Sequence, residues 1–336
     1  MPTVAIDARD AYAGQLRGWG RHTRDLLGGL PERPGLRYRV LRGGGPGPEL
    51  VFEQLGLPVR LRRLRADLVH TPNCFLPLAR PCPGVVTIHD LAFEEFPQDF
   101  AARTGWKYRT FTPLSARSAQ RVICVSGYTA ADVVRRYDVD EARVRVIPNA
   151  PSLPFGDEPP PREGPYLLAV GDLRPKKNLL RLVQAFRALR REGLEHRLVL
   201  AGVDGGESER VRAAAGGEPV VLTGYVSDAR LDALMRGADV LVHPSLYEGF
   251  GLVLVEAMVR GVPVVAARAT ALPETGGDGA EYFDPLDAGD MAAAIRRVLC
   301  DAQRRAELVR RGHLRAAALS WEQTGALTAA VYEELL

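Results

Sequence analysis

Residues 242–252 read Val242-His243-Pro244-Ser245-Leu246-Tyr247-Glu248-Gly249-Phe250-Gly251-Leu252, and Glu256-Ala257-Met258 follow shortly after. The apolar run that ends at His243 is typical of a buried strand, the glycines mark a turn, and a helix is predicted to begin near Gly249–Leu252. Parallel sheets covered by helices are built from such strand–turn–helix units. The start of the helix offers backbone N–H groups and a positive dipole end, which suit a phosphate.

Two glutamates accompany this helix. Glu248 stands at its start, and Glu256 comes eight residues later. Eight residues make a little over two helical turns, so we expect both carboxylates to lean toward one side. Carboxylates beside a phosphate can accept hydrogen bonds from the vicinal hydroxyls of a ribose or a hexose. The simpler alternative makes both glutamates solvated residues, and the motifs below favour the functional interpretation.

A second turn of this kind carries cations. It reads Val170-Gly171-Asp172-Leu173-Arg174-Pro175-Lys176-Lys177-Asn178. A buried strand precedes it, and a helix is predicted to start near Asn178, a favourable N-cap residue. Three cations at the carboxyl end of a strand suit a diphosphate, and the alternative is a solvated basic loop.

Two motifs in the first half end predicted strands in the same way. His89-Asp90 follows Val86-Thr87-Ile88, so its imidazole is expected at the ligand-binding edge of a sheet, where Asp90 can orient the ring or bind a sugar hydroxyl. Ile6-Asp7-Ala8-Arg9 is followed by a glycine-bearing loop that includes Gly18, where a backbone can approach a phosphate closely. Because the glycines do not form a Gly-x-Gly-x-x-Gly fingerprint, a dinucleotide site is not supported.

Short apolar strands alternate with amphipathic segments along the whole chain, which predicts parallel sheets with helices on both faces. In the first half the expected strands are Thr3–Ile6, Tyr38–Leu41, Asp67–His70, Val85–Ile88, Arg121–Val125 and Val144–Ile147. In the second half they are Tyr166–Val170, Arg197–Ala201, Val220–Thr223, Val240–His243 and Val262–Ala266. Helices are expected between most of them, for example over Leu179–Arg191 and Asp228–Arg236.

A proline-rich break separates the two halves. It runs from Pro148-Asn149-Ala150-Pro151 to Pro159-Pro160-Pro161 and has the composition of a stiff linker. We therefore expect one doubly wound α/β domain over residues 1–157 and a second over 158–318, facing each other across a cleft. Ligands of such sheets bind beyond the carboxyl ends of the strands.

Composition excludes several classes of protein. The 336 residues are 46% hydrophobic and 25% charged, which is ordinary for a globular protein. Residues 1–157 carry 22 Lys and Arg against 16 Asp and Glu, too slight an excess to predict nucleic-acid binding. No apolar stretch is long enough to span a membrane and no signal peptide is recognised, so a cytoplasmic protein is expected. The four cysteines have no spacing typical of zinc or disulfides.

One acidic pair resembles a metal-binding motif. Asp138-Val139-Asp140 has the Asp-x-Asp spacing found in another class of sugar transferases. It falls between a predicted helix over Thr129–Tyr137 and a predicted strand, among exposed charges. We interpret it as a surface turn and predict no metal site.

Taken together, these motifs resemble glycosyltransferase family 4, the large family of retaining enzymes with the GT-B fold of two Rossmann-like domains. The Glu248-x7-Glu256 spacing, the Gly171 to Asn178 turn and His89-Asp90 occur in the family's order. The resemblance extends from Ile6-Asp7-Ala8-Arg9 to Ser320-Trp321-Glu322. It implies that residues 319–336 form a helix, capped by Ser320, that crosses back to the first domain.

The resemblance implies a role for each motif. Glu248 and His89 would contact the donor sugar at the reacting centre, and Glu256 would hold the ribose. The remaining donor-binding residues implied are Gly18, Asp90, Lys176, Lys177, Tyr225, Gly249, Phe250, Gly251, Leu252 and Val253. Many members carry arginine at the position of Asp172, so Arg174 or Lys176 would supply the second phosphate-binding cation here, and we prefer Lys176.

The implied activity is that of a metal-independent hexosyltransferase without a cofactor. It would move a hexose, with mannose as one candidate, from a GDP- or UDP-sugar to a glycan, a lipid-linked acceptor or a small molecule. Retention would follow from front-face attack, with the departing diphosphate taking the acceptor's proton. Residues 100–120 mix Arg103, Trp106 and Lys107 on a predicted helix, which suits an acceptor or peripheral contact with the inner membrane face, or simply a solvated helix over a core.

Two alternatives remain at this point. A catalytically inactive partner subunit would share the fold, but it need not keep Glu248, Glu256, Lys177 and His89. A sugar-nucleotide epimerase would need acid and base carboxylates that are not identifiable here. The base of the donor, the acceptor, the linkage and the oligomeric state do not follow from the sequence.

Overall fold

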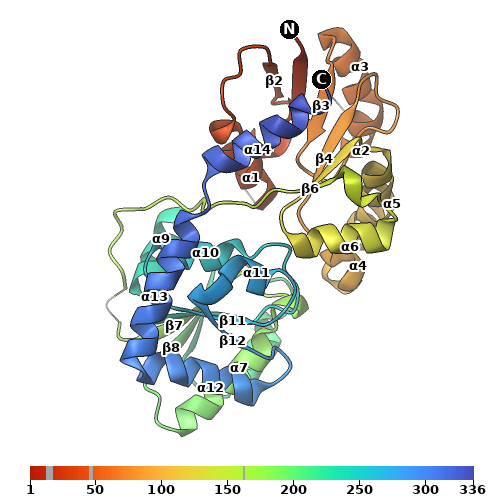
Figure 1. The fold of residues 1–336 in the computed structure, drawn as a ribbon. Helices are drawn as coiled ribbons and strands as arrows, with labels where there is room; N and C mark the ends of the chain where they lie inside the picture. The colour runs from red at the N-terminus through yellow and green to blue at the C-terminus, as the bar shows by residue number, and fades with distance from the viewer. Residues whose placement is uncertain (13–17, 45–47, 162) are drawn as a thin grey trace. The chain divides into compact units, whose positions relative to one another are not determined.

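The structure is a computed structural model that describes residues 1–12, 18–44, 48–161 and 163–336. The chain divides into two compact units, which Figure 1 draws as a colour ramp from red to blue. Unit 1 comprises Met1–Ser152 and Leu319–Leu336, and unit 2 comprises Leu153–Ala318. The change of unit thus falls inside the proline-rich break, slightly before the expected boundary at residue 157.

Unit 1 is built on a six-stranded parallel sheet in the order β2-β1-β3-β4-β5-β6. The strands are β1 (Thr3–Asp7), β2 (Arg37–Leu41), β3 (Leu68–Thr71), β4 (Gly84–Ile88), β5 (Arg121–Cys124) and β6 (Val144–Val146). The chain moves from β1 outward to β2 and then returns to the other side of β1 at β3. Ligands of doubly wound sheets bind beside such a reversal.

The α-helices of unit 1 connect these strands. They are α1 (Gly18–Gly29), α2 (Glu49–Val51), α3 (Leu57–Leu64), α4 (Ala92–Glu95), α5 (Ala102–Ser118), α6 (Gly127–Tyr137) and α14 (Trp321–Glu333), with a π-helical turn at Phe52–Gly56 and short 3-10 turns at Arg9–Tyr12, Pro97–Asp99 and Glu141–Arg143. Alternate residues of each inner strand enter different cores. Ala5 and Val69 pack on one face of the sheet, whereas Val4 and Leu68 pack on the other. Burial of both faces explains the nearly continuous apolar runs in the sequence.

The C-terminal helix α14 belongs to unit 1, as the resemblance implied, and Figure 1 shows it in dark blue beside α1. Ser320 caps it by accepting a hydrogen bond from the backbone N–H of Gln323 at 3.1 Å. At its far end the Tyr332 hydroxyl lies 2.6 Å from His70 Nδ1. A Cβ atom on Gly325 would lie 2.0 Å from the carbonyl oxygen of Gly29, so the crossing of α1 and α14 requires glycine there.

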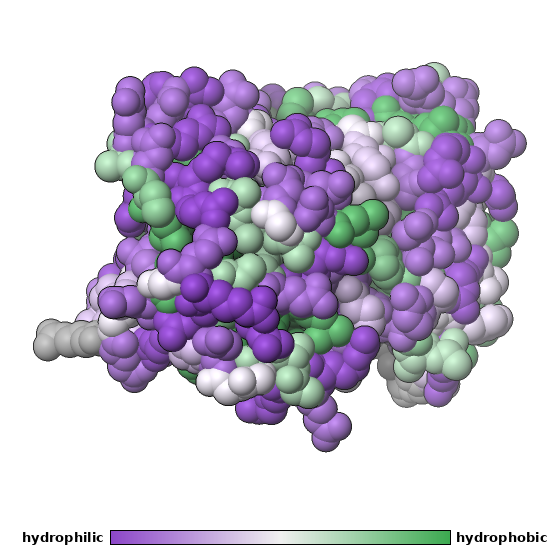
Figure 2. Space-filling model, turned by 90° about the horizontal axis from the view of Figure 1, so that it is seen from below, coloured by the Kyte–Doolittle hydropathy of each residue, from purple (hydrophilic) through white to green (hydrophobic). Residues whose placement is uncertain are grey.

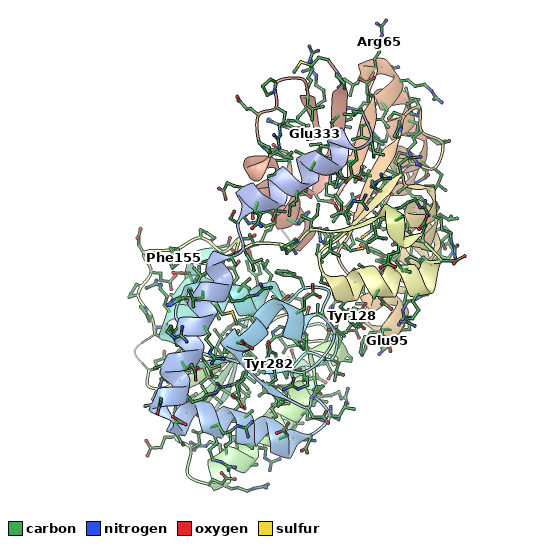
Figure 3. The ribbon with its side chains drawn as sticks, viewed as in Figure 1. Arg65, Glu95, Tyr128, Phe155, Tyr282 and Glu333 are labelled. Carbon is green, nitrogen blue, oxygen red and sulfur yellow. The ribbon has the colours of Figure 1, made fainter. Side chains whose placement is uncertain are left out.

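Unit 2 has a second six-stranded parallel sheet, in the order β12-β11-β10-β7-β8-β9. The strands are β7 (Tyr166–Val170), β8 (Arg197–Ala201), β9 (Val220–Gly224), β10 (Val240–His243), β11 (Val264–Ala267) and β12 (Ala280–Phe283). The prediction omitted β12, because Ala280-Glu281-Tyr282-Phe283 is a short edge strand that contains a charged residue. Tyr282 is labelled on this strand in Figure 3. The reversal of this sheet lies between β7 and β10.

The helices of unit 2 are α7 (Leu179–Arg191), α8 (Ser208–Ala215), α9 (Asp228–Gly237), α10 (Leu252–Val259), α11 (Leu272–Gly276), α12 (Ala288–Cys300) and α13 (Ala302–Ala317), with 3-10 turns at Pro175–Lys177 and Gly277–Gly279. The predicted helix over Leu179–Arg191 matches α7, and that over Asp228–Arg236 matches α9 to within one residue. Two doubly wound α/β units with a returning C-terminal helix confirm the expected fold class.

The surface in Figure 2 is mostly hydrophilic, and its hydrophobic residues form small separate areas. No helix in the described residues is long and apolar enough to cross a membrane. The four cysteines are free thiols, and Cys124 is buried in the core as predicted.

Candidate functional site

The loops after β7 and β10 bring a cation and a carboxylate together at the reversal of the second sheet. Lys177 Nζ donates a hydrogen bond to Glu248 Oε1 at 2.5 Å. His243 Nε2 lies 3.1 Å from the same oxygen. The backbone N–H of Glu248 donates to Thr270 Oγ1 at 2.9 Å, which fixes the loop. Lys177 and Glu248, predicted from separate motifs, are therefore adjacent.

Special backbone positions allow this approach. Gly171 has φ +143, and a Cβ atom there would lie 2.9 Å from Cε of Lys177. Asn178 adopts a left-handed conformation with φ 55, and its side chain does not cap α7. Instead, Asn178 Nδ2 donates to the carbonyl oxygens of Pro244 at 3.1 Å and Pro285 at 2.8 Å. Asn178 thus occupies the N-cap position of α7, as predicted, but its amide ties the β7 loop to its neighbours and does not cap the helix.

The charge state of this centre follows from its neighbours. Burial alone would raise the pKa of Glu248, but Lys177, the His243 hydrogen bond and Lys176 outweigh it and hold that pKa well below its usual range. Burial lowers the pKa of His243, so its ring is neutral near pH 7. A carboxylate can only accept hydrogen bonds, and His243 Nε2 must therefore carry its proton. The centre presents an ionised carboxylate beside an ammonium group.

The α10 N-terminus lies immediately after this centre in the chain. The helix begins at Leu252, and Gly251 precedes it with φ 97. Gly249, Phe250 and Gly251 are buried, whereas Leu252 and Val253 are partly exposed. The first N–H groups of a helix have no intrahelical acceptors, and α10 directs its positive dipole end toward this side. The arrangement suits an anion.

Glu256 and Glu248 contact different residues. The helix α10 begins at Leu252, within the predicted range, so Glu248 precedes it and Glu256 lies inside it. That both carboxylates lean toward one side stays a prediction. Glu256 is 4% exposed, and its Oε1 accepts the backbone N–H of Leu153 at 2.7 Å. Its Oε2 accepts from Arg260 Nη1 at 3.1 Å. A carboxylate has about four lone-pair sites, so contact with a ribose stays a prediction.

Of the two candidate second cations, Arg174 faces Asp172. Arg174 Nε lies 3.8 Å from Asp172 Oδ2. Lys176 instead contributes to the low pKa of Glu248, and its carbonyl accepts the backbone N–H of Leu246 at 2.8 Å. These contacts favour Lys176.

Tyr225 follows β9 and is 69% exposed, after Gly224 with φ 68. An exposed ring on this loop is compatible with stacking on a base, which stays a prediction.

In unit 1, His89 follows β4 and is 8% exposed. Its Nε2 lies 2.7 Å from the Pro72 carbonyl oxygen, so Nε2 is the donor. Burial lowers the pKa of His89, which leaves the neutral ring with Nδ1 as an acceptor. Asp90 Oδ1 accepts the backbone N–H of Ala92 at 2.9 Å, and the charge of Asp90 opposes the lowering of the His89 pKa. Contact of Asp90 with a sugar hydroxyl stays a prediction.

Sequence reasoning missed two ring neighbours of His89, and a third ring that packs on one of them. The Trp19 ring stacks on His89 with centroids 5.8 Å apart, and the His22 ring meets it edge-on at 4.5 Å. Trp321 from α14 packs on His22 at 5.5 Å. His22 Nδ1 lies 2.8 Å from Asn149 Oδ1. The helical spacing of Gly18 and His22 was the available signal, but His22 comes together with residues far apart in the chain.

Gly18 is the first residue of α1, and a Cβ atom there would meet nothing within 4 Å. Open space beside this backbone is compatible with a ligand, and the predicted phosphate contact stays a prediction.

The acidic pair at Asp138 and Asp140 is an exposed turn, as expected. Asp138 ends α6 in a left-handed conformation, and Asp140 Oδ1 accepts the backbone N–H of Ala142 at 2.9 Å. Over residues 1–12, 18–44, 48–161 and 163–336, no three His, Cys, Asp or Glu side chains gather as a metal site.

A buried charged cluster lies at the end of β1. The Glu53 side chain is 0% exposed and pairs with Lys107 at 3.0 Å and Arg9 at 3.4 Å. Burial raises the pKa of Glu53 from 4.5 to about 7, although both cations oppose the shift. The folded protein therefore binds this proton more tightly than the unfolded chain does. The stabilisation is complete below pH 4.5 and is lost as the pH rises through about 7.

We predict that Glu53→Gln removes this pH dependence. Relative to the variant, the wild-type free energy of unfolding should fall by about 3 kcal/mol between pH 5 and pH 8. Urea unfolding at several pH values measures the difference. Glu49→Gln is the control, because the Glu49 side chain is 59% exposed and binds the same lysine. Equal slopes in wild type and Glu53→Gln would contradict the prediction.

Two known protein families match this chain, one in each half. Residues 17–152 match the description "Glycosyltransferase Family 4", and residues 155–315 match "Glycosyl transferases group 1". The chain is 31% identical to the O-antigen chain mannosyltransferase B of Escherichia coli, covering 82% of this chain and 76% of that protein. It is also 31% identical to the MMP alpha-(1->4)-mannosyltransferase of Mycolicibacterium hassiacum, covering 87% and 76%.

A solved structure supports the fold over the whole length. The Anabaena protein HepE, in complex with UDP-glucose, superposes with a TM-score of 0.73 at 19% sequence identity. The superposition covers 99% of this chain and 100% of that one.

Proposed function

Because the chain belongs to glycosyltransferase family 4, we propose that it transfers a hexose from a GDP- or UDP-sugar to a hydroxyl of a glycan, glycolipid or small molecule, with retention of anomeric configuration. The observation that carries this proposal is the contact of Lys177 with Glu248 beside the N-terminus of α10. The cation and the helix amides suit the diphosphate of a nucleotide sugar, and the ionised carboxylate suits its hydroxyl groups.

Each part of the donor has a matching group in unit 2. Lys177 and Lys176 bind the diphosphate together with the amides of Leu252 and Val253. Glu248 accepts from hydroxyls of the donor hexose. Glu256 accepts from the ribose, and Tyr225 stacks on the base. The low pKa of Glu248 supports its part, since an ionised carboxylate is the stronger acceptor.

The chemistry is loss of the diphosphate with attack by the acceptor hydroxyl on the same face. Lys177, Lys176 and the α10 amides stabilise the charge that grows on the departing phosphate oxygen, which takes the acceptor's proton. In unit 1, His89 Nδ1 accepts from a hydroxyl of the donor hexose near the reacting carbon. With cations and helix amides in this role, the reaction proceeds without a divalent metal, so transfer should persist in EDTA.

Mannose from GDP-mannose is the first donor to test, because two relatives are named mannosyltransferases. UDP-glucose is the second, because it is bound in the structure of HepE. Transfer is measured as acceptor-dependent release of nucleoside diphosphate, with the product's anomer read by NMR. Donor conversion without an acceptor would indicate an epimerase, and nucleotide binding without turnover would indicate an inactive partner subunit.

We predict that the matching nucleotide sugar raises the melting temperature of the protein. At a ligand concentration about 100-fold above Kd, binding adds about 2.7 kcal/mol of stability. For a unit of this size that corresponds to a shift of several degrees. A panel of UDP-, GDP-, ADP- and TDP-sugars tests it, with Lys177→Ala as the variant that should lose the shift. No shift with any of them at millimolar concentration would contradict the prediction.

Peripheral contact with a membrane through residues 100–120 is the remaining proposal from the sequence. Trp106 on α5 is 53% exposed, which suits such contact, yet Lys107 is held by Glu49 and Glu53. Because two carboxylates already hold the Lys107 ammonium group, this lysine is less suited to an anionic lipid surface.

A further inference from the structure

Unit 1 contains a pocket of about 350 Å³, to which the donor-binding roles proposed above assign no ligand. Asp10, just beyond β1, and Asn73, just beyond β3, both line it. Asn73 Nδ2 donates to Asp10 Oδ2 at 3.1 Å, so the pocket lies where the first sheet reverses. Doubly wound sheets bind ligands at that point, and this volume falls in the range of small-molecule sites.

Aromatic rings form much of the pocket lining. Trp19, Phe75, Trp106 and Tyr108 all contribute. Tyr108 lies 5.0 Å from Phe75 and 5.4 Å from Trp19 between ring centroids, which makes a rigid wall. Trp106 stands at the side with 53% of its surface exposed. Flat aromatic faces suit the C–H face of a pyranose, whose hydroxyls then point to polar groups at the rim.

The charges around the pocket balance one another. Arg103 and Lys107 line it together with Asp10 and Glu49. Lys107 Nζ is already held by Glu49 at 2.9 Å and Glu53 at 3.0 Å, and it lies 4.1 Å from the Phe75 ring centroid. A phosphate would therefore gain little net attraction here. Carboxylate and amide groups accept from and donate to hydroxyls, so the polar lining favours an uncharged polyol.

The pocket also adjoins the residue expected at the reacting centre. Trp19 lines the pocket and stacks on His89 at an interplanar angle of 18°. One ring thus joins the wall of the pocket to the imidazole.

We propose that this pocket is the acceptor subsite and that it takes an uncharged terminal hexosyl unit, stacked against Trp106 and its aromatic neighbours. The inference rests on the proposed glycosyl transfer and adds to it the chemical class of the acceptor. The hexosyl unit can end a soluble oligosaccharide or a glycolipid, because the pocket recognises only that unit.

The test is a ligand-observed NMR titration of the full chain in the presence of GDP or UDP. The probes are the methyl α-glycosides of mannose, glucose and galactose, with mannose 6-phosphate and glucose 6-phosphate as anionic counterparts. At least one neutral glycoside should bind, and more tightly than its phosphorylated counterpart. Trp106→Ala should raise its Kd about tenfold. Leu114→Ala is the matched control on α5, being 39% exposed and outside the pocket lining, and should leave the Kd unchanged.

Several results would overturn the inference. These are failure of all neutral glycosides to bind at high millimolar concentration, tighter binding of the phosphorylated sugars, or an unchanged Kd in Trp106→Ala. A further contrary result would be that the protein binds no glycoside but sediments with anionic phosphatidylglycerol vesicles, and that Trp106→Ala abolishes the sedimentation. That result would reassign α5 to a membrane surface. Binding of GDP or UDP is recorded in the same samples. Nucleotide binding without glycoside binding rejects only the acceptor subsite, whereas absence of both rejects the proposed function.

Discussion

Replacing Lys177 with alanine should lower the rate of sugar transfer about 100- to 1,000-fold, the usual effect of removing one group that stabilises charge in a transition state. Lys177 Nζ donates to Glu248 Oε1 at 2.5 Å, and its side chain passes close to the backbone of Gly171, where a Cβ atom would crowd it. The variant loses the charge that meets the departing diphosphate. It also leaves Glu248 with His243 as its hydrogen-bonding partner in the centre.

Two variants separate catalysis from stability. Arg191→Ala removes a cation from the exposed end of α7 and should transfer sugar at the wild-type rate. Lys177→Arg keeps the charge but enlarges the group, and we expect it to recover only part of the activity. Initial rates at saturating donor, read beside the melting temperature, measure the effect. A Lys177→Ala variant that transfers within a few-fold of wild type would remove this residue from the mechanism.

Replacing Arg260 with alanine should destabilise unit 2 by about 3–5 kcal/mol, as breaking a buried ion pair does. The Arg260 and Asp232 side chains are both 0% exposed, with Nε and Oδ1 2.7 Å apart. Arg260 also donates to Glu256 Oε2 at 3.1 Å and to the Leu153 carbonyl at 2.8 Å. Its guanidinium lies 4.6 Å from the ring centroid of Phe155, which is labelled in Figure 3. The variant removes this shared cation from two buried carboxylates, Asp232 and Glu256, although Asp232 keeps its bond from Arg236 Nε at 2.7 Å.

Low pH should act on the same cluster. Burial would raise the pKa of Asp232, but hydrogen bonds from the Gly156 N–H, Arg236 and Arg260 outweigh it and lower that pKa. The stabilisation it gives is present above the unfolded pKa near 3.8 and is lost as the pH falls through the lower folded value. Chemical denaturation of Arg260→Ala at pH 7 gives the main result. Arg296→Ala is the control, because it breaks an exposed pair with Glu192 and should cost at most about 1 kcal/mol. Equal losses of unfolding free energy in the two variants would contradict the larger contribution predicted for the buried cluster.

The fold could be predicted because its signals are local. Strands buried on both faces appear as continuous apolar runs, such as Tyr166–Val170, and the helix over Leu179–Arg191 has a regular apolar stripe. The edge strand β12 gave no such run, because one of its four residues is charged. The side chain of Asn178 also could not be placed, since its partners Pro244 and Pro285 are distant in the chain.

The turns of the site could be predicted from the sequence, whereas most of its side-chain contacts could not. Glycine turns and helix starts mark where Lys177 and Glu248 lie along the chain, and strand adjacency of β7 and β10 brings them together. The same reasoning did not indicate the partners of Glu256, whose carboxylate accepts from the backbone N–H of Leu153 and the side chain of Arg260. His22 was missed because its contacts with His89, Asn149 and Trp321 arise from packing between segments far apart in sequence.

The most direct test of the donor site is a calorimetric titration of GDP and of UDP, in EDTA, into wild type, Lys177→Ala and Arg191→Ala. The account predicts that one nucleotide binds wild type and Arg191→Ala equally, and binds Lys177→Ala at least about tenfold more weakly. Equal binding to all three proteins, or binding of neither nucleotide, would contradict a diphosphate seat built from Lys177 and the α10 N-terminus.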